Sequence, residues 1–266
     1  MWMHNGGIGG WRYLKRKLAA SVGERWFLGV QGSTDSEWAF AVFLDSLEAL
    51  GVDPSADPGE KGIGHVVMRK ALLRTIERIN EFTGEVKREH REEEVVSLLN
   101  FAVTDGHDVI CCRYVSSKTD EAASLFFSSG TSWAAPKDGD RKGDYRMERR
   151  DKGANIVLIA SEPLTFERGM LVGDKFLGLA DTSTDNWVTV PTNSTVTIHK
   201  QTVLIHPILD SFYDHTPSLG RSSKLALEQG QTSVNKDRIL TATRSGGEAS
   251  QLSPPTIYAQ GALAMR

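Results

Sequence analysis

The chain has 266 residues, and its 31 lysines and arginines nearly balance its 34 aspartates and glutamates, so the formal net charge at pH 7 is −3. This balance excludes the strongly basic surface of a typical nucleic-acid-binding domain and provides no field that would draw the chain to a membrane. The longest uninterrupted apolar run, residues 38–44, is far shorter than the ~20 residues that span a bilayer. With no secretory signal pattern in its first residues, the sequence indicates a cytoplasmic globular protein that binds neither nucleic acid nor membrane.

Helical spacing of apolar residues predicts two helices in the first third of the chain. Residues 34–37, Thr-Asp-Ser-Glu, fit a capping box with Thr34 as the N-cap and Glu37 three residues on. The apolar residues that follow recur at helical spacing until Gly51, which ends the run. A second amphipathic pattern predicts a helix over 65–82, and we expect a loop between the two.

Strand patterns dominate from residue 95 onward. Residues 95–104 and 109–115 flank the turn Asp105-Gly106, a strong hairpin signal. Further β-branched runs predict strands over 125–129, 156–161, 187–191 and 195–205, with a polar surface loop over 135–153. Helices early and strands late favour an α+β architecture with a mainly antiparallel sheet. Residues 217–266 lack periodic apolar residues, and we expect a mostly disordered tail there.

The two cysteines of the chain, Cys111 and Cys112, are adjacent. Neighbouring side chains in a strand point to opposite faces, so a disulfide between them would need a distorted backbone. A zinc site would need histidine partners at a suitable spacing, which the sequence does not show. We therefore expect a reduced protein with two small core residues, and neither a metal nor a cofactor.

The glycine-rich start of the chain is a candidate for chemistry. It lacks the spacing of a dinucleotide fingerprint and the Gly-Lys-Ser/Thr of a phosphate loop. An amide beside a flexible glycine, as in Asn5-Gly6, can aim one side-chain donor and one backbone N–H at the same point, which is the geometry of an oxyanion hole. The alternative is a tight glycine turn beside a packed tryptophan.

Asp35 is the second candidate. The predicted helix cap already explains Thr34 and Glu37 but does not need Asp35. A carboxylate at this position can bind a substrate ammonium group through a charge-assisted hydrogen bond. The alternative is that Asp35 belongs only to the helix cap.

Taken together, the two motifs resemble the class II glutamine amidotransferases, which are N-terminal nucleophile hydrolases. His4-Asn5-Gly6 is followed about thirty residues later by Ser33-Thr34-Asp35-Ser36-Glu37, in the family's order. The resemblance covers about 1–217. Within the family, the set of motifs is most similar to the fungal amidotransferase subunit of glutathione degradation. Further segments agree in order with the family: Leu98-Leu99-Asn100, Thr104-Asp105-Gly106, Cys112-Arg113-Tyr114, Ser161-Glu162-Pro163-Leu164 and Val188-Thr189-Val190-Pro191-Thr192-Asn193.

The resemblance implies an αββα sandwich with mainly antiparallel sheets, formed by an amidotransferase domain over 1–216. By the same resemblance, Asn5 and Gly6 form the oxyanion hole, and Asp35 holds the α-amino group of the substrate. The implied reaction is cleavage of the γ-glutamyl amide bond of glutamine or glutathione, in glutathione catabolism. A metallopeptidase-like subunit is the implied partner.

The chain departs from the family pattern at its nucleophile. The family uses an N-terminal cysteine, whereas this sequence begins Met1-Trp2. We therefore expect a chain truncated at its N-terminus, with the first strands of the sheet missing. Residues 170–184 are a second departure, because they interrupt a segment that is continuous in the family.

Two other functions compete with this interpretation. One is a non-catalytic fragment or pseudoenzyme that binds a γ-glutamyl ligand or a partner subunit without turnover. The other is an α+β domain with an unrelated binding role.

Overall fold

A computed structural model describes residues 1–89, 95–130, 132–134, 146–148, 155–163, 187–200, 202–214 and 221–232. The described helices precede most of the strands along the chain. They are α1 (Trp11–Ser21), α2 (Glu24–Gly29), α3 (Asp35–Glu48), the 3-10 turn η1 (Gly59–Lys61), α4 (His65–Glu89) and the short α5 (Lys224–Glu228). None of the described helices is long and apolar enough to cross a membrane.

The main sheet has five antiparallel strands in the order β1-β2-β3-β9-β10. Its members are β1 (Trp2–Gly7), β2 (Leu98–Thr104), β3 (Asp108–Arg113), β9 (Ser194–His199) and β10 (Thr202–Pro207). A second antiparallel sheet has the order β7-β4-β8, with β4 (Phe126–Gly130), β7 (Ile156–Ala160) and β8 (Val188–Thr189). The strands β5 (Ser132–Ala134) and β6 (Arg146–Glu148) pair with each other.

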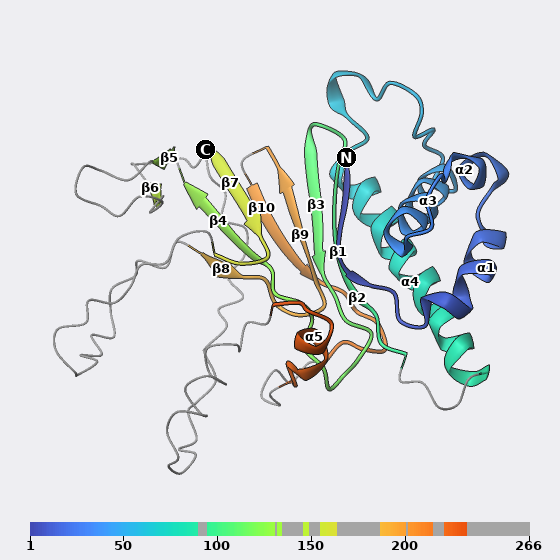
Figure 1. Cartoon of the computed structure of the whole chain (residues 1–266). Helices are drawn as coiled ribbons and strands as arrows, with labels where there is room; N and C mark the ends of the chain where they lie inside the picture. The colour runs from blue at the N-terminus through green and yellow to red at the C-terminus, as the bar shows by residue number, and fades with distance from the viewer. Residues whose placement is uncertain are drawn as a thin grey trace, which may run out of the picture.

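The described elements form layers, with helices α1–α4 on one face of the main sheet and the second sheet on the other (Figure 1). Strand β3 shows the cause, because its side chains alternate between two apolar clusters. Ile110 and Cys112 pack with the helices, whereas Cys111 packs with Leu125 and Phe127 beside the second sheet. The expected α+β architecture with antiparallel sheets is confirmed.

Both cysteines are free and buried, as expected of small core residues. Burial raises the pKa of each thiol to about 12.

The two expected helices are present as α3 and α4, although α4 continues to Glu89 rather than ending near residue 82. Helices α1 and α2 were not predicted. Helix α1 begins after Gly10, which has a left-handed backbone and no side chain that could cap the helix, so the sequence lacks the usual start signal. The burial of Leu14 and Leu18 against the main core stabilises α1 instead.

The opening residues form a strand at the edge of the described sheet, which excludes the alternative of a tight glycine turn, because β1 pairs with β2 along its whole length, from Trp2 opposite Val103 to Gly7 opposite Leu98. One expectation about strands was wrong. The expected single strand over 195–205 is two strands, β9 and β10, which pair with each other. The chain reverses after Lys200, which has a positive φ of 55°. The sequence gives no signal for this turn, because a lysine occupies a position where glycine or asparagine is usual.

Part of the expected tail packs on the folded body. Helix α5 buries Ala226 against Val96, Leu98 and Val115. The backbone of Ser222 exchanges hydrogen bonds with the segment before β4, where it accepts from the Glu121 N–H at 2.8 Å. Residues 217–220 and 233–266 lie outside the described residues, as do the insertion at 170–184 and most of the expected loop over 135–153, so those expectations stay predictions.

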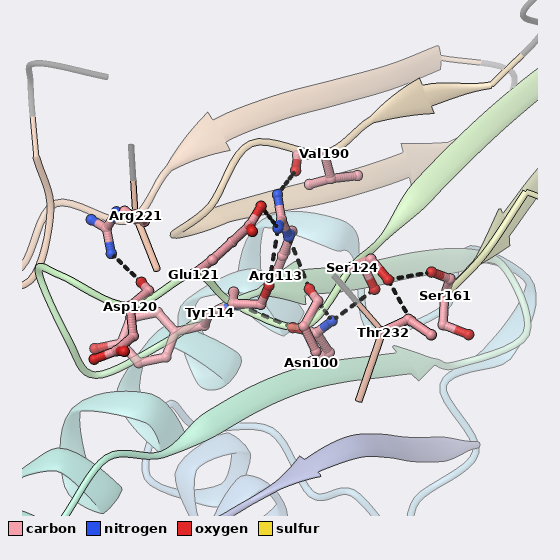
Figure 2. Close-up of polar contacts among 12 residues, drawn as sticks. Asn100, Arg113, Tyr114, Asp120, Glu121, Ser124, Ser161, Val190, Arg221 and Thr232 are labelled. Carbon is pink, nitrogen blue, oxygen red and sulfur yellow. Dashed lines mark hydrogen bonds and ion pairs between the residues drawn. The ribbon is translucent and has the colours of Figure 1, made fainter. Parts of the chain in front are cut away.

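Arg113, the last residue of β3, joins several segments through its buried guanidinium (Figure 2). Its nitrogens donate to the carboxylate of Glu121 at 2.9 Å and to the carbonyl of Val190 at 2.9 Å. It also donates to the carbonyls of Ala122 and Ala123, both at 2.9 Å. The guanidinium therefore holds the chain before β4 and the chain after β8 against the main sheet.

We predict that replacing Arg113 with methionine lowers the free energy of unfolding by about 3 to 5 kcal/mol, because the buried Glu121 carboxylate loses its hydrogen bond to the Arg113 guanidinium. The double variant R113M/E121L removes the buried carboxylate as well and should lose less stability than R113M alone. Urea unfolding of the wild type and both variants measures the difference. Equal stability of R113M and the wild type would contradict a structural role for this pair.

Candidate active site

The side chain of Asn5 lies near the C-terminal end of β1. Asn5 is directly opposite Asn100 in the antiparallel register, so the two side chains share one face of the sheet. The side-chain amide of Asn100 donates to the carbonyls of Ala123 and Ser124, which places this face away from the helices. Within the described residues the Asn5 amide makes no hydrogen bond, so both of its N–H groups are available to a ligand.

Gly6 follows at a point where the backbones of β1 and β2 approach closely. Its φ is 143°, a conformation that L side chains rarely adopt. A Cβ atom at this position would lie 2.0 Å from the carbonyl oxygen of Leu98. The glycine is therefore required by the fold itself, in addition to any role of its N–H in binding an oxyanion.

Asp35 is the first residue of α3, and the tertiary structure brings it to the end of β1. Its Oδ2 accepts the backbone N–H of Ile8 at 2.8 Å, and its Oδ1 accepts the N–H of Ser36 at 2.9 Å. The Asp35 carboxylate thus lies beside the residues that directly follow Asn5-Gly6. No lysine or arginine of the described chain pairs with it, so its negative charge remains available to a cationic group.

The cap of α3 is simpler than the sequence predicted. Thr34 is the N-cap, and its hydroxyl accepts the N–H of Glu37 at 3.4 Å. The carboxylate of Glu37 accepts from Gln31 at 2.8 Å instead of returning to Thr34, so half of the expected capping box is missing. Asp35 also accepts a first-turn N–H of α3, that of Ser36, while its other oxygen accepts the N–H of Ile8 outside the helix.

His4 holds the first turn of α3 against β1. Its Nδ1 lies 2.9 Å from the hydroxyl of Ser36, and its Nε2 donates to the carbonyl of Leu98 at 3.2 Å. Burial lowers the pKa of His4 below its ordinary value, although the Leu98 carbonyl and the charge of Asp35 act in the opposite direction. A neutral His4 ring therefore links Ser36, the neighbour of Asp35, to the strand that carries Asn5.

A second polar cluster lies on the same face of the sheet as Asn5. The Oδ1 of Asn100 accepts the N–H of Tyr114, and the hydroxyl of Ser124 donates to the carbonyl of Ser161 at 2.6 Å (Figure 2). Ser161 opens the family-like segment Ser-Glu-Pro-Leu, of which Leu164 lies outside the described residues. Sequence reasoning assigned Asn100 no role, although a polar residue within an apolar strand pattern is a signal that could have identified it.

The other family-like segments supply structural contacts. The Oδ1 of Asp105 accepts the N–H groups of His107 and Asp108 at 3.0 and 2.9 Å, and its Oδ2 accepts that of Ile63 at 2.7 Å. Burial by itself would raise the pKa of Asp105, but these backbone donors lower it overall. Asn193 bonds through its side chain to the backbone of Val115 at 2.9 Å. These residues hold turns and loops, and the structure does not bring them to Asn5.

Neither cysteine is placed to act as the nucleophile. Both are less than 2% exposed, and the backbone carbonyl of Leu99 accepts a hydrogen bond from the Cys112 thiol at 3.1 Å. The thiolate is the nucleophilic form of cysteine, and a pKa raised to about 12 leaves almost none of it at neutral pH.

The chain is similar in sequence to a probable glutamine amidotransferase. Over 228 residues, or 86% of its length, it is 47% identical to the probable glutamine amidotransferase DUG3 of Saccharomyces cerevisiae. The match covers 57% of that protein, so the chain spans little more than half the length of this relative. No protein-family profile matches the sequence.

Two solved bacterial structures are also similar to the chain. One is a glutamine aminotransferase class-II domain protein from Silicibacter pomeroyi, with 20% identity, a TM-score of 0.45, and coverage of 77% of this chain and 66% of that one. The other is a predicted glutamine amidotransferase from Pseudomonas aeruginosa, with 17% identity, a TM-score of 0.40, and coverage of 76% and 58%. Both TM-scores lie below 0.5, so neither structure defines the fold of this chain.

We predict that Gly6→Ala destabilises the protein by about 2 to 5 kcal/mol, because the new Cβ meets the Leu98 carbonyl in a strained conformation. Gly84→Ala is the matched control, since Gly84 lies within α4 with nothing near its added Cβ, and alanine there should stabilise by roughly 0.5 to 1 kcal/mol. Thermal melts of both variants measure the contrast. A Gly6→Ala protein as stable as the wild type would show that this close approach does not constrain the fold.

The lowered pKa of His4 predicts that stability depends on pH below its ordinary pKa of 6.5. The unfolded chain then binds a proton that the folded His4 does not, so the free energy of unfolding falls as the pH drops from 6.5 toward the folded-state pKa. His4→Gln, which cannot titrate, should show a smaller loss between pH 7.5 and pH 5. Urea unfolding across that range is the measurement, and identical pH profiles for the two proteins would rule out His4 as the cause.

Proposed function

We propose that this chain forms the body of a class II glutamine amidotransferase that hydrolyses a γ-glutamyl amide bond. The observation that supports the proposal is the position of Asp35 relative to the strand that carries Asn5. The two residues are thirty apart in sequence, yet the bond from the Ile8 N–H to the Asp35 carboxylate brings Asp35 to the end of β1 that follows Asn5-Gly6. In the proposal, the Asn5 amide serves one end of a γ-glutamyl substrate and the charge of Asp35 serves the other.

The two residues have complementary tasks in the proposed reaction. The side-chain amide of Asn5, with the N–H of Gly6, donates hydrogen bonds to the oxyanion that develops on the attacked γ-carbonyl. Asp35 binds the α-ammonium group of the glutamyl moiety by a charge-assisted hydrogen bond. Because Asp35 is anchored through Ile8 and Ser36, it meets the substrate in a preset orientation.

The nucleophile of the proposed reaction is an N-terminal cysteine in a longer form of the protein, as the family resemblance implies. Its thiolate attacks the γ-carbonyl to form a thioester, and water then hydrolyses the thioester to glutamate. In this proposal the upstream residues also add the strands that complete an αββα sandwich. The burial of Cys111 and Cys112 supports a nucleophile other than these two thiols.

Glutathione is the proposed substrate, acting in glutathione catabolism in the cytoplasm. The support is the resemblance to the fungal amidotransferase subunit that works in glutathione degradation. Asn5 and Asp35 contact only the γ-glutamyl end, which glutamine and glutathione share. Discrimination between the two substrates therefore depends on other residues.

A metallopeptidase-like partner subunit is a further part of the proposal and has the same support. Co-expression of the two proteins followed by gel filtration tests it. A common elution peak is expected, and two separate peaks would contradict the partnership.

A second candidate function is binding of a γ-glutamyl ligand without turnover. The observation that favours it is again the burial of both thiols, which leaves the sequence as given without an accessible cysteine. The two functions differ in whether glutamate is released.

Glutamate release from glutamine and from glutathione separates these two functions. The chain as given should release none, and a form extended to begin with Met-Cys should release glutamate from glutathione faster than from glutamine. Turnover by the chain as given would contradict the assigned nucleophile. Failure of the extended form, combined with calorimetric binding of glutamine by the given chain, would support the non-catalytic function.

In the active form, we predict that Asn5→Ala lowers kcat roughly 100- to 1,000-fold with little change in KM, because the lost donor acts mainly in the transition state. Asp35→Asn keeps an acceptor for the Ile8 N–H but removes the charge, so it should raise KM at least about tenfold. Steady-state kinetics on both substrates is the measurement.

Met3→Ala is the matched control for these variants, since Met3 lies two residues before Asn5 in β1 and is exposed. It should retain wild-type kinetics. An unchanged kcat in Asn5→Ala would show that Asn5 is not part of the oxyanion hole. An unchanged KM in Asp35→Asn would show that Asp35 does not bind the substrate.

A further inference from the structure

Three potential metal ligands meet at one end of the main sheet, far from Asn5. Asp108 is the first residue of β3, His199 is the last residue of β9, and His65 is the first residue of α4. One potential ligand atom from each residue lies within 4.8 Å of those of the other two. Sequence spacing could not reveal this group, because 43 residues separate His65 from Asp108 and 91 separate Asp108 from His199.

The carboxylate of Asp108 is the centre of the cluster. Its Oδ1 lies 2.6 Å from the Nδ1 of His199, and its Oδ2 lies 3.8 Å from the Nδ1 of His65. The two imidazole rings face each other, with centroids 4.4 Å apart. Asp108 and His199 are also directly paired across the sheet, so the backbone register fixes their approach.

Within the described residues, the charge of Asp108 is faced by the imidazoles of His199 and His65 and not by a permanent cation. The Asp108 side chain is 4% exposed, and a buried carboxylate is costly unless a cation or a metal compensates it. No lysine or arginine of the described chain pairs with Asp108. The neighbouring carboxylate of Asp105 adds negative charge and is already occupied by backbone N–H groups.

We propose that His65, Asp108 and His199 bind one divalent transition-metal ion, with zinc as the best fit. Imidazole nitrogens and one carboxylate suit zinc, cobalt or nickel, whereas magnesium and calcium favour sites made of oxygen ligands. Three protein ligands leave a fourth tetrahedral position for water.

Side-chain rotation must adjust the geometry before it accepts the ion. Two ligands at about 2.1 Å from zinc lie about 3.4 Å apart in a tetrahedral site, so ligand atoms spread over 4.8 Å must approach by up to about 1.4 Å. The 2.6 Å contact between Asp108 Oδ1 and His199 Nδ1 must lengthen by about 0.8 Å. The rings of His65 and His199 are 32% and 39% exposed, which leaves them room to rotate, while buried Asp108 stays in place. The proton that His199 shares with Asp108 moves to the other ring nitrogen when Nδ1 becomes the ligand.

The metal would have a structural function. Asn5 is opposite Asn100 in β2, and Thr104 of β2 is opposite Val109, the residue after Asp108. The cluster is therefore about five residues, or about 17 Å, from Asn5 along the strand direction. In Figure 1 the starts of β3 and α4 lie at the end of the sheet where β1 begins. A bound ion would fasten the first turn of α4 to β3 and β9, and this inference does not depend on the proposed amidotransferase reaction.

The experiment is titration of the chelator-treated full chain with Zn²⁺ by calorimetry and with Co²⁺ by visible absorption. We expect one ion per chain and the cobalt absorption of a four-coordinate site. At free zinc about 100-fold above Kd, the melting temperature should rise by roughly 5 to 10 °C. Mg²⁺ should produce neither effect.

The variants H65Q and H199Q test the ligands, and H199Q retains a donor for Asp108. Each should weaken zinc binding at least about tenfold and abolish the cobalt spectrum. The matched control is H107Q, since His107 precedes Asp108 but is not part of the cluster. Melts in chelator show whether each variant is folded.

Several outcomes would overturn the proposal. They are no stoichiometric zinc binding by the folded wild type, unchanged binding in the folded H65Q and H199Q variants, or an equal loss in H107Q. A response to Mg²⁺ as large as that to Zn²⁺ would also contradict a transition-metal site.

Discussion

The buried guanidinium of Arg113 is the contact that joins the separate parts of this structure. It satisfies a carboxylate and three carbonyls in segments that neither sheet would hold by its own pairing. A buried arginine is tolerated only when such partners surround it, since desolvation of the charge is otherwise costly. The desolvation lowers the pKa of Arg113, and the nearby Glu121 carboxylate opposes that effect. The chain on either side of the second sheet is thereby held against β3.

The position of Asn5 in the edge strand β1 is fixed by contacts of its neighbours. The carbonyl of Leu98 approaches Gly6 so closely that only glycine fits, and the same carbonyl accepts from His4 on the helical side. His4 in turn contacts Ser36, and Asp35 holds Ile8. The residues next to the proposed catalytic groups therefore also hold the fold together. A change of activity on substituting Gly6 therefore reports mostly on the fold. The Asn5 side chain makes no hydrogen bond within the described residues, so its substitution is the more direct test of chemistry.

The two ends of the main sheet differ in character. Within the described residues, the end with Asn5 and Asp35 combines an amide that makes no hydrogen bond with a carboxylate that accepts two backbone N–H groups and pairs with no lysine or arginine. The other end places two imidazoles around a buried carboxylate, an arrangement suited to a cation. Because the antiparallel order of the strands separates these ends, a ligand at one is not a component of the site at the other.

Local signals in the sequence were sufficient to predict the elements that have a cap, a turn or an alternating pattern within their own residues. Thr34 capped a helix where predicted, Asp105-Gly106 turned a hairpin, and alternation placed Cys111 and Cys112 in opposite apolar clusters. The ordered motifs around Asn5, Asp35 and Arg113 were likewise visible in the sequence and indicated the similarity to a glutamine amidotransferase. Whether Asn5, Gly6 and Asp35 perform the predicted chemistry is a separate matter that the kinetic variants address.

Only the tertiary structure decided the features that depend on distant partners. Strand β1 exists because β2, almost a hundred residues later, supplies its hydrogen bonds, and α1 forms without a cap because the core buries its leucines. The requirement for glycine at position 6 comes from a carbonyl at position 98, and the cluster of His65, Asp108 and His199 comes from strand register. Sequence patterns report the local preferences of the backbone and the spacing of side chains. Contacts between residues far apart in the chain depend on packing, which no local pattern encodes.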